Sequence, residues 1–316
     1  MKNIIKKTPV PIAGVMLGMA ALGNLIQSYS EGLRLIFGFI SVVLGILLIL
    51  KVIMYPEAIK EDFKNPIMAS VSGTFSMVIM LLAVYVKPLI GSSAIFIWYL
   101  GIVLHIALII YFTVNFIFKF NIKKVFASYF IVYVGIVVGS ITAPAFEKKG
   151  LGQVFFYFGF ISLIILLGVV GYRYIKYKEI PEPAQPLICI FAAPASLCLA
   201  GYLQSFDTKS KTFVIVLAVV SSIIYIFALS QLPKLLKLKF YPSYSAFTFP
   251  FIISGIAIKQ TMVFLSKMEM NTVLISYIVS IQTIIAIALT INVLILYIRF
   301  LTAKELNINS DIAKTN

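Results

Sequence analysis

The stretch FYPSYSAFTFPFIISGIAIK, which runs from Phe240 to Lys259, combines a hydrophobic segment with residues that break helices. It contains Pro242, Pro250, several hydroxyl side chains and a final lysine. Proline removes a backbone donor and kinks a helix. In a membrane, the carbonyl freed in this way is tolerated only where protein or water can satisfy it. The stretch therefore predicts a membrane-spanning helix whose surroundings are protein or a pore rather than lipid.

The composition of the whole chain agrees with a membrane protein. Of 316 residues, 61% are hydrophobic and 12% are charged, and the mean hydropathy is +1.05. Soluble domains are usually about 45–50% apolar. No long polar stretch could form a separate soluble domain, so residues 1–316 are expected to be one transmembrane domain with short tails. The charged start and apolar run at the N-terminus resemble a signal peptide, but no clear cleavage site follows, and we expect a retained first span.

Ten apolar runs are long enough to cross a bilayer core of about 30 Å as helices. They cover residues 9–28, 33–54, 66–86, 95–118, 126–144, 152–172, 186–204, 212–232, 242–265 and 271–300. The runs do not alternate between apolar and polar residues as strands of a barrel would, and helices satisfy their own backbone groups in lipid. The predicted fold class is an all-α polytopic membrane protein.

The distribution of basic residues predicts the orientation of these spans. Of 26 Lys and Arg residues, 18 fall in the termini and in the connections after even-numbered spans, and seven fall on the other side. The positive-inside rule then places both termini in the cytoplasm. Because the net charge of +15 is spread over short loops, it is explained by topology, and no nucleic-acid partner is expected.

The odd-numbered spans share a spacing and a composition that suggest five repeated hairpins. Pro9, Pro66, Pro186 and Pro242 mark four of their starts, at intervals of 57, 120 and 56 residues. Prolines, small residues and hydroxyl residues concentrate in the odd spans, so we expect these to form an inner ring around a pore. The residues expected to line the pore are Gly14, Ser72, Gly73, Gly135, Ala193, Pro194 and Thr248. In the tenth span, Ser276, Ser280, Gln282, Thr283, Thr290 and Asn292 are candidates to face a neighbouring subunit.

The charges missing from the spans exclude several functions. All 11 carboxylates map to connections or termini, which argues against a cation channel and against carboxylate-based proton coupling. His105 is expected to hydrogen-bond a neighbouring helix. Lys259 has two interpretations, either snorkelling to the outer surface or attracting anions at the outer mouth. There is no catalytic constellation, so an intramembrane enzyme or a scaffold is disfavoured, and no metal or cofactor is expected.

Two motifs carry a resemblance to a known family. The segments IFAAPASLCLAGYLQSF (190–206) and YPSYSAFTFPF (241–251) resemble the tellurite-resistance/dicarboxylate transporter family, which is related to the plant guard-cell slow anion channels. The resemblance implies five hairpins around a central pore in each subunit, a homotrimer and, for a bacterial chain, the inner membrane. It also implies that an aromatic side chain occludes the pore. Phe249, immediately before Pro250, is the best match, and Phe247 is the alternative.

These observations leave two main functional hypotheses. The first is a channel for small monovalent anions such as chloride or nitrate, with a narrow pore that has few charged sites. The second is a secondary transporter of C4-dicarboxylates such as malate, or an exporter of tellurite-related oxyanions. A divalent substrate usually requires paired cations, and the spans contain one lysine, so the channel is favoured.

Overall fold

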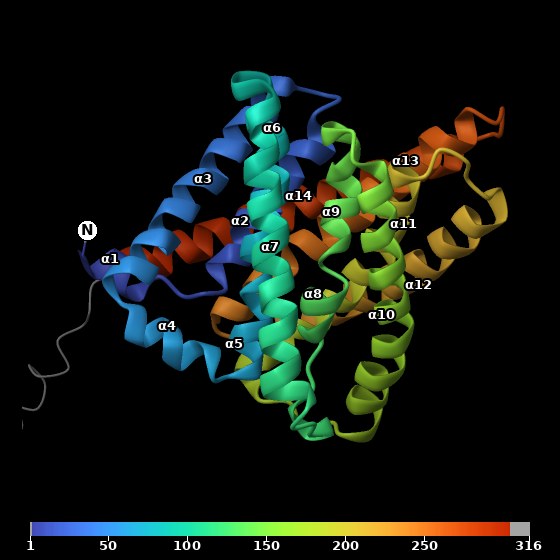
Figure 1. Ribbon diagram of the computed structural model, residues 1–316. Coiled ribbons are helices and arrows are strands. Elements are labelled where there is room, and N and C mark those ends of the chain that lie inside the picture. The colour runs from blue at the N-terminus through green and yellow to red at the C-terminus, as the bar shows by residue number, and fades with distance from the viewer. Residues whose placement is uncertain (1, 304–316) are drawn as a thin grey trace, which may run out of the picture.

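The computed structural model describes residues 2–303, and every element in that range is helical. The short helix α1 (Lys2–Lys7) lies beside the end of α14 (Val273–Thr302), as Figure 1 shows. Lys7 Nζ donates to the carbonyl oxygen of Ala303 over 2.9 Å. Both ends of the described chain therefore lie at one end of the molecule, called here the termini end. The predicted cytoplasmic tail at 304–316 lies outside the described residues.

Five long helices form the outside of the molecule. They are α3 (Glu31–Met54), α7 (Ala94–Phe112), α10 (Lys149–Lys176), α12 (Lys211–Leu235) and α14. Each exposes large apolar side chains: Phe39, Val103, Ile161, Ile223 and Ile284 are 58–67% exposed. A surface of this kind is stable against lipid and not against water. These helices form the outer layer of the described chain, and the expectation that they face lipid stays a prediction.

The inner segments consist of shorter helices than the outer layer and, apart from the first segment, they are interrupted. They are α2 (Ile12–Ile26), α5 (Pro66–Val71) with α6 (Gly73–Ile90), α8 (Tyr129–Tyr133) with α9 (Val137–Thr142) and η4 (Ala143–Phe146), η5 (Glu182–Phe191) with α11 (Ala192–Ser205), and η6 (Pro242–Phe247) with α13 (Phe249–Ser266). The connecting elements are α4 (Pro56–Phe63), η1 (Gly91–Ser93), η2 (Thr113–Ile117) and η3 (Ile122–Lys124). The interruptions occur in buried segments, where protein groups can satisfy the freed backbone.

The inner segments close into a ring. Helix α2 packs against α6, α6 against α9, α9 against α11, α11 against α13, and α13 returns to α2. Each of the five also packs against the long helix that follows it in the chain, which makes five consecutive inner–outer pairs. A closed ring of this kind leaves its axis to be filled by the side chains of the inner segments alone.

Seven helical stretches among the described residues are long and apolar enough to cross a membrane, and one of them, Pro66–Ile117, includes both an inner and an outer segment. Ile12–Ile26 and Val137–Phe146 are shorter apolar helices. The all-helical membrane fold is therefore confirmed, whereas the number of ten crossings stays a prediction.

The expected kink at Pro250 is a boundary between two helices instead. The 3₁₀ segment η6 ends at Phe247, and α13 begins at Phe249 with Pro250 in its first turn. Proline is tolerated there because the first backbone N–H groups of a helix have no intrahelical acceptor.

Two sets of buried polar residues were singled out from the sequence. His105 is fully buried and, as expected, bonds neighbouring helices: Nδ1 lies 2.7 Å from Ser76 Oγ on α6 and Nε2 lies 3.0 Å from the Val132 carbonyl oxygen on α8. On α14, Gln282, Thr283 and Thr290 are buried within the subunit, so the expectation that they face a neighbour is wrong. Of the six candidates on that helix, Ser276, Ser280 and Asn292 are exposed.

Candidate permeation pathway

A central cavity lies on the axis of the ring and is lined by all five inner segments. Its wall consists of Gly14, Val71, Thr74, Met77, Phe130, Ile131, Val134, Gly135, Leu187, Ile190, Ala193, Pro194, Leu197, Ser245, Ala246, Phe249 and Pro250. About 40 Å³ is open to the centres of water-sized molecules. Since a single water needs roughly 10–15 Å³ by this measure, the space holds a few waters at most.

The wall of the central cavity is almost entirely apolar. Even the hydroxyl of Thr74 is used locally, because it donates to the Val71 carbonyl oxygen over 2.7 Å. No charged residue belongs to the wall, all of which lies within the described range. A narrow apolar constriction of this kind can exclude water and stop ions without complete steric closure.

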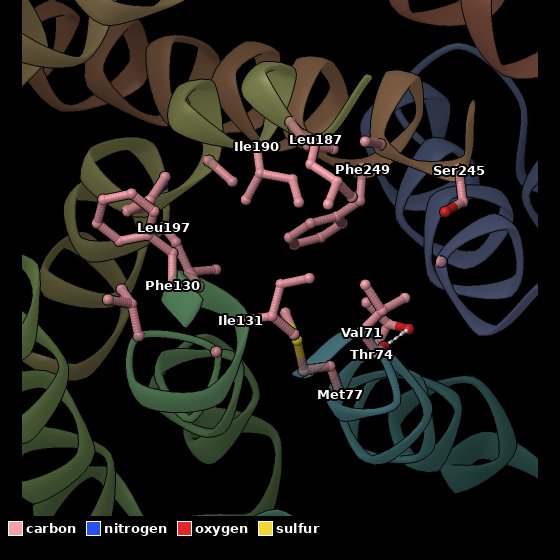
Figure 2. Close-up of a pocket in the computed structure, with 17 residues that line it drawn as sticks. Val71, Thr74, Met77, Phe130, Ile131, Leu187, Ile190, Leu197, Ser245 and Phe249 are labelled. Atoms are coloured by element: carbon pink, nitrogen blue, oxygen red, sulfur yellow. Dashed lines mark hydrogen bonds between the residues drawn. The ribbon is translucent and has the colours of Figure 1, made fainter. Parts of the chain in front are cut away.

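Phe249 occupies the middle of this cavity. Figure 2 shows its ring between Leu187 and Ile190 on one side and Ile131 on the other. The residue is 6% exposed, and it also contributes to the wall of a second cavity, the vestibule. One aromatic side chain thus lies between two separate spaces on the axis. It is the first residue of α13 and directly follows the break at Thr248.

The vestibule has a different chemistry from the central cavity. Its volume is about 330 Å³, and its polar lining residues are Asn24, Gln27, Arg34, Thr142, Gln204 and Gln260. A further space of about 450 Å³, the mouth cavity, adjoins it and shares Asn24, Gln204, Ile256 and Gln260. Lys209, Lys259 and Lys267 line the mouth cavity. Among residues 2–303, no carboxylate lines either space, so this end of the axis, opposite to the termini end, favours anions.

Lys259 lies at the edge of the mouth cavity, where its ammonium group is anchored. Nζ donates to the Leu25 carbonyl oxygen over 2.8 Å and to Ser28 Oγ over 2.6 Å, and it lies 5.1 Å from the centre of the Tyr29 ring. The side chain therefore reaches towards the end of α2 and also contributes its charge to the mouth cavity. Both interpretations of this lysine are compatible with that geometry.

Six of the residues singled out from the sequence share the central cavity. Gly14, Gly135, Ala193, Pro194, Phe249 and Pro250 all belong to its wall. Glycine is required at two of them by close approach. A Cβ atom at Gly14 would lie 2.9 Å from Ser245 Cβ, and one at Gly135 would lie 2.1 Å from the Ile131 carbonyl oxygen.

Four other residues singled out from the sequence lie outside the wall of the central cavity. Ser72 lines a lateral pocket of about 470 Å³ between the α3–α4 and α6–α7 segments. A Cβ atom at Gly73 would point at Leu108, Ile131 and His105. Thr248 is fully buried and donates to the Gly14 and Ser245 carbonyl oxygens over 3.0 and 2.7 Å. Phe247 is also fully buried, with its ring 4.8 Å from that of Tyr244.

Sequence reasoning missed the amide side chains of the vestibule. Asn24, Gln204 and Gln260 each lie in the C-terminal half of an inner helix. An amide at such a depth is costly unless it is hydrogen-bonded, and that cost was the available signal. Apolar wall residues such as Met77 and Leu187 carry no comparable signal, because similar residues fill the rest of the core.

Two matches to known proteins can be set beside this geometry. Over 69 residues the chain is 35% identical to GPI mannosyltransferase 3 of Candida glabrata, a match that covers 21% of this chain and only 11% of that protein. So short a likeness carries no argument about fold or function. Residues 8–298, in contrast, match the family described as SLAC1, voltage-dependent anion channel. With nearly its whole length matched, the chain belongs to the SLAC1 family of voltage-dependent anion channels.

Proposed function

We propose that the protein is a channel for small monovalent anions such as chloride and nitrate, which pass along the axis of the ring in each subunit. The observation that carries the proposal is the position of Phe249 in the walls of both the central cavity and the vestibule. A single apolar side chain between two cavities can act as a gate by steric blockage and by excluding water. Removing the ring would join the two spaces.

The charges along the axis support anions rather than cations. Arg34, Lys209, Lys259 and Lys267 line the vestibule and mouth cavity, and neither has a carboxylate in its wall. Cations at a mouth raise the local concentration of anions, while the uncharged central cavity provides no strong site from which an anion could not leave. These two properties together suit conduction.

The finer architecture belongs to the same proposal. Residues 1–316 would form one transmembrane domain of ten crossings, with both termini in the cytoplasm of a bacterial cell and three subunits side by side in the inner membrane. The adjacent chain ends and the interrupted inner segments are compatible with this arrangement. The termini end would then be cytoplasmic, and the vestibule would open to the outside.

Two alternatives are a transporter of C4-dicarboxylates and an exporter of tellurite-related oxyanions. Either would need a central binding site, and a divalent substrate would call for paired cations. The wall of the central cavity has no charged residue to supply them. This difference favours the channel.

Recordings from purified protein in planar bilayers test the proposal directly. Phe249→Ala is expected to give large currents that reverse at the equilibrium potential of the anion, while wild type gives small ones. Replacing sodium with a bulky organic cation should leave the currents unchanged. Currents that follow the cation gradient, or folded Phe249→Ala protein with no current, would overturn the proposal. Saturable exchange without current would indicate a carrier.

A further inference from the structure

Three side-chain amides meet where the vestibule joins the mouth cavity. Asn24 on α2, Gln204 on α11 and Gln260 on α13 line both spaces. The three helices are neighbours in the inner ring, because α13 packs against both α2 and α11. Gln260 lies six residues before the end of α13 at Ser266, which corresponds to about 9 Å along the helix axis. The amides therefore lie between the cationic mouth and Phe249.

The donors of these amides are not used within the protein. Among the described residues, Gln204 and Gln260 make no side-chain hydrogen bond, so their Nε2 donors are unused. Arg34 Nε donates to Asn24 Oδ1 over 3.1 Å. Because Arg can only donate, this bond fixes the amide orientation and leaves the two N–H groups of Asn24 Nδ2 unused. The three residues are only partly buried, so their unused donors line the shared space and can bond water or a ligand there.

The surroundings of the amides decide the charge of that ligand. Arg34, Lys209, Lys259 and Lys267 line the two spaces, whereas no Asp or Glu in the described part of the chain does. Arg34 is paired with Glu31, which leaves the three lysines as the net positive charge. Amide N–H groups hydrogen-bond anions more strongly than neutral acceptors. The site thus offers positive charge at long range and directional donors at short range.

We propose that Asn24, Gln204 and Gln260 form a binding site for a small trigonal oxyanion of the nitrate class, which is held there before it passes Phe249. The assignment rests on the proposed anion conduction. It adds the position of a binding site on the axis and a preference among anions. Donors on three different helices can each meet one oxygen of a planar trigonal anion. A chloride ion is a single centre and contacts fewer of them at once. The site therefore favours nitrate over chloride.

Binding can be measured without conduction, on wild type with Phe249 intact. The NMR line width of chloride reports its exchange with protein sites, and added nitrate narrows the line as it displaces chloride. We expect the Gln204→Leu/Gln260→Leu double variant to need about tenfold more nitrate for the same narrowing, a loss of about 1.4 kcal/mol. Gln260→Glu, which keeps the side-chain shape but removes the donors and adds a negative charge, should weaken nitrate binding at least as much.

The control is Gln231→Leu. This glutamine lies near the C-terminal end of α12, outside the proposed site, and its Nε2 donates to Ser230 Oγ. It should leave displacement by nitrate unchanged. Equal nitrate dependence in wild type, the double variant and Gln260→Glu would overturn the assignment, as would the absence of nitrate-sensitive broadening in wild type.

The outcomes also separate this site from the channel proposal. If the Phe249→Ala variant conducts but the glutamine variants bind nitrate normally, the amide site is wrong and the channel stands. If that variant is silent while nitrate binding depends on the glutamines, the site stands and conduction through the ring is wrong.

Discussion

Replacing Phe249 and Phe247 separately by alanine provides a sharp test of how the axis is built. The two rings are two residues apart, and both are buried, at 6% and 0% exposure. Phe247 packs in the interior against Tyr244, with ring centres 4.8 Å apart. Phe249 instead lies between the central cavity and the vestibule. The same chemical change therefore leaves a closed void in one case and an enlarged, water-accessible space in the other.

The expected stability difference follows from these surroundings. A Phe→Ala change in a closed core costs about 3–5 kcal/mol, which includes the unfavourable cavity left behind. Loss of the burial of one Phe side chain alone accounts for about 1.5–3 kcal/mol. Since water can fill the space left by Phe249, we expect Phe249→Ala to be more stable than Phe247→Ala by about 1–2 kcal/mol, or roughly 5- to 30-fold in the folded-to-unfolded ratio.

Both variants can be compared by reversible unfolding in mixed micelles and by anion flux from liposomes. Phe249→Ala should be the more stable of the two and the only one with strongly increased flux. Flux in Phe247→Ala with none in Phe249→Ala would show that the other ring closes the axis. Equal destabilisation with no flux in either folded variant would refute the idea of an aromatic gate.

Three further predictions concern the ends of the axis and the helix junction. Lys259→Ala, made in the conducting Phe249→Ala background, should reduce anion conductance at low salt and have little effect at high salt, because salt screens charges beyond about 8–10 Å near physiological ionic strength. An effect independent of salt would exclude attraction of anions at the mouth cavity. Hydrogen bonding by Lys149 lowers the pKa of the Asp207 carboxyl below its ordinary value of 3.8, so this pair stabilises the fold above that value and stops doing so as the pH falls through the lowered pKa. Asp207→Asn should abolish this acid dependence of unfolding, and an unchanged pH profile would contradict the pairing. Thr248→Val removes the hydroxyl that donates to the Gly14 carbonyl oxygen and should cost about 0.5–1.5 kcal/mol of unfolding free energy, whereas unchanged stability would show that the bond is dispensable.

Much of the fold is determined by composition and by the placement of proline. Apolar length requires membrane helices, because lipid provides no partner for free backbone groups. The concentration of Pro, Gly and Ser in alternate spans separates an inner layer from an outer one, since interrupted helices are stable only inside protein. These constraints act within each segment, so they can be recognised without any long-range contact. The pairing of His105 with neighbouring helices follows from the same cost of leaving a polar group unpaired.

The identity of the residues that face the axis depends on tertiary structure. Whether Phe249 or Phe247 points inward depends on where η6 ends and α13 begins, and that boundary is held by the Thr248 hydroxyl on the Gly14 carbonyl, 234 positions away in the chain. Ser72 turns to a lateral pocket because α5 and α6 meet at a break, which no local pattern revealed. The vestibule amides come from three separate helices. Local sequence determines which segments are buried, whereas contacts between distant segments set the rotation of each helix and so decide which side chains meet on the axis.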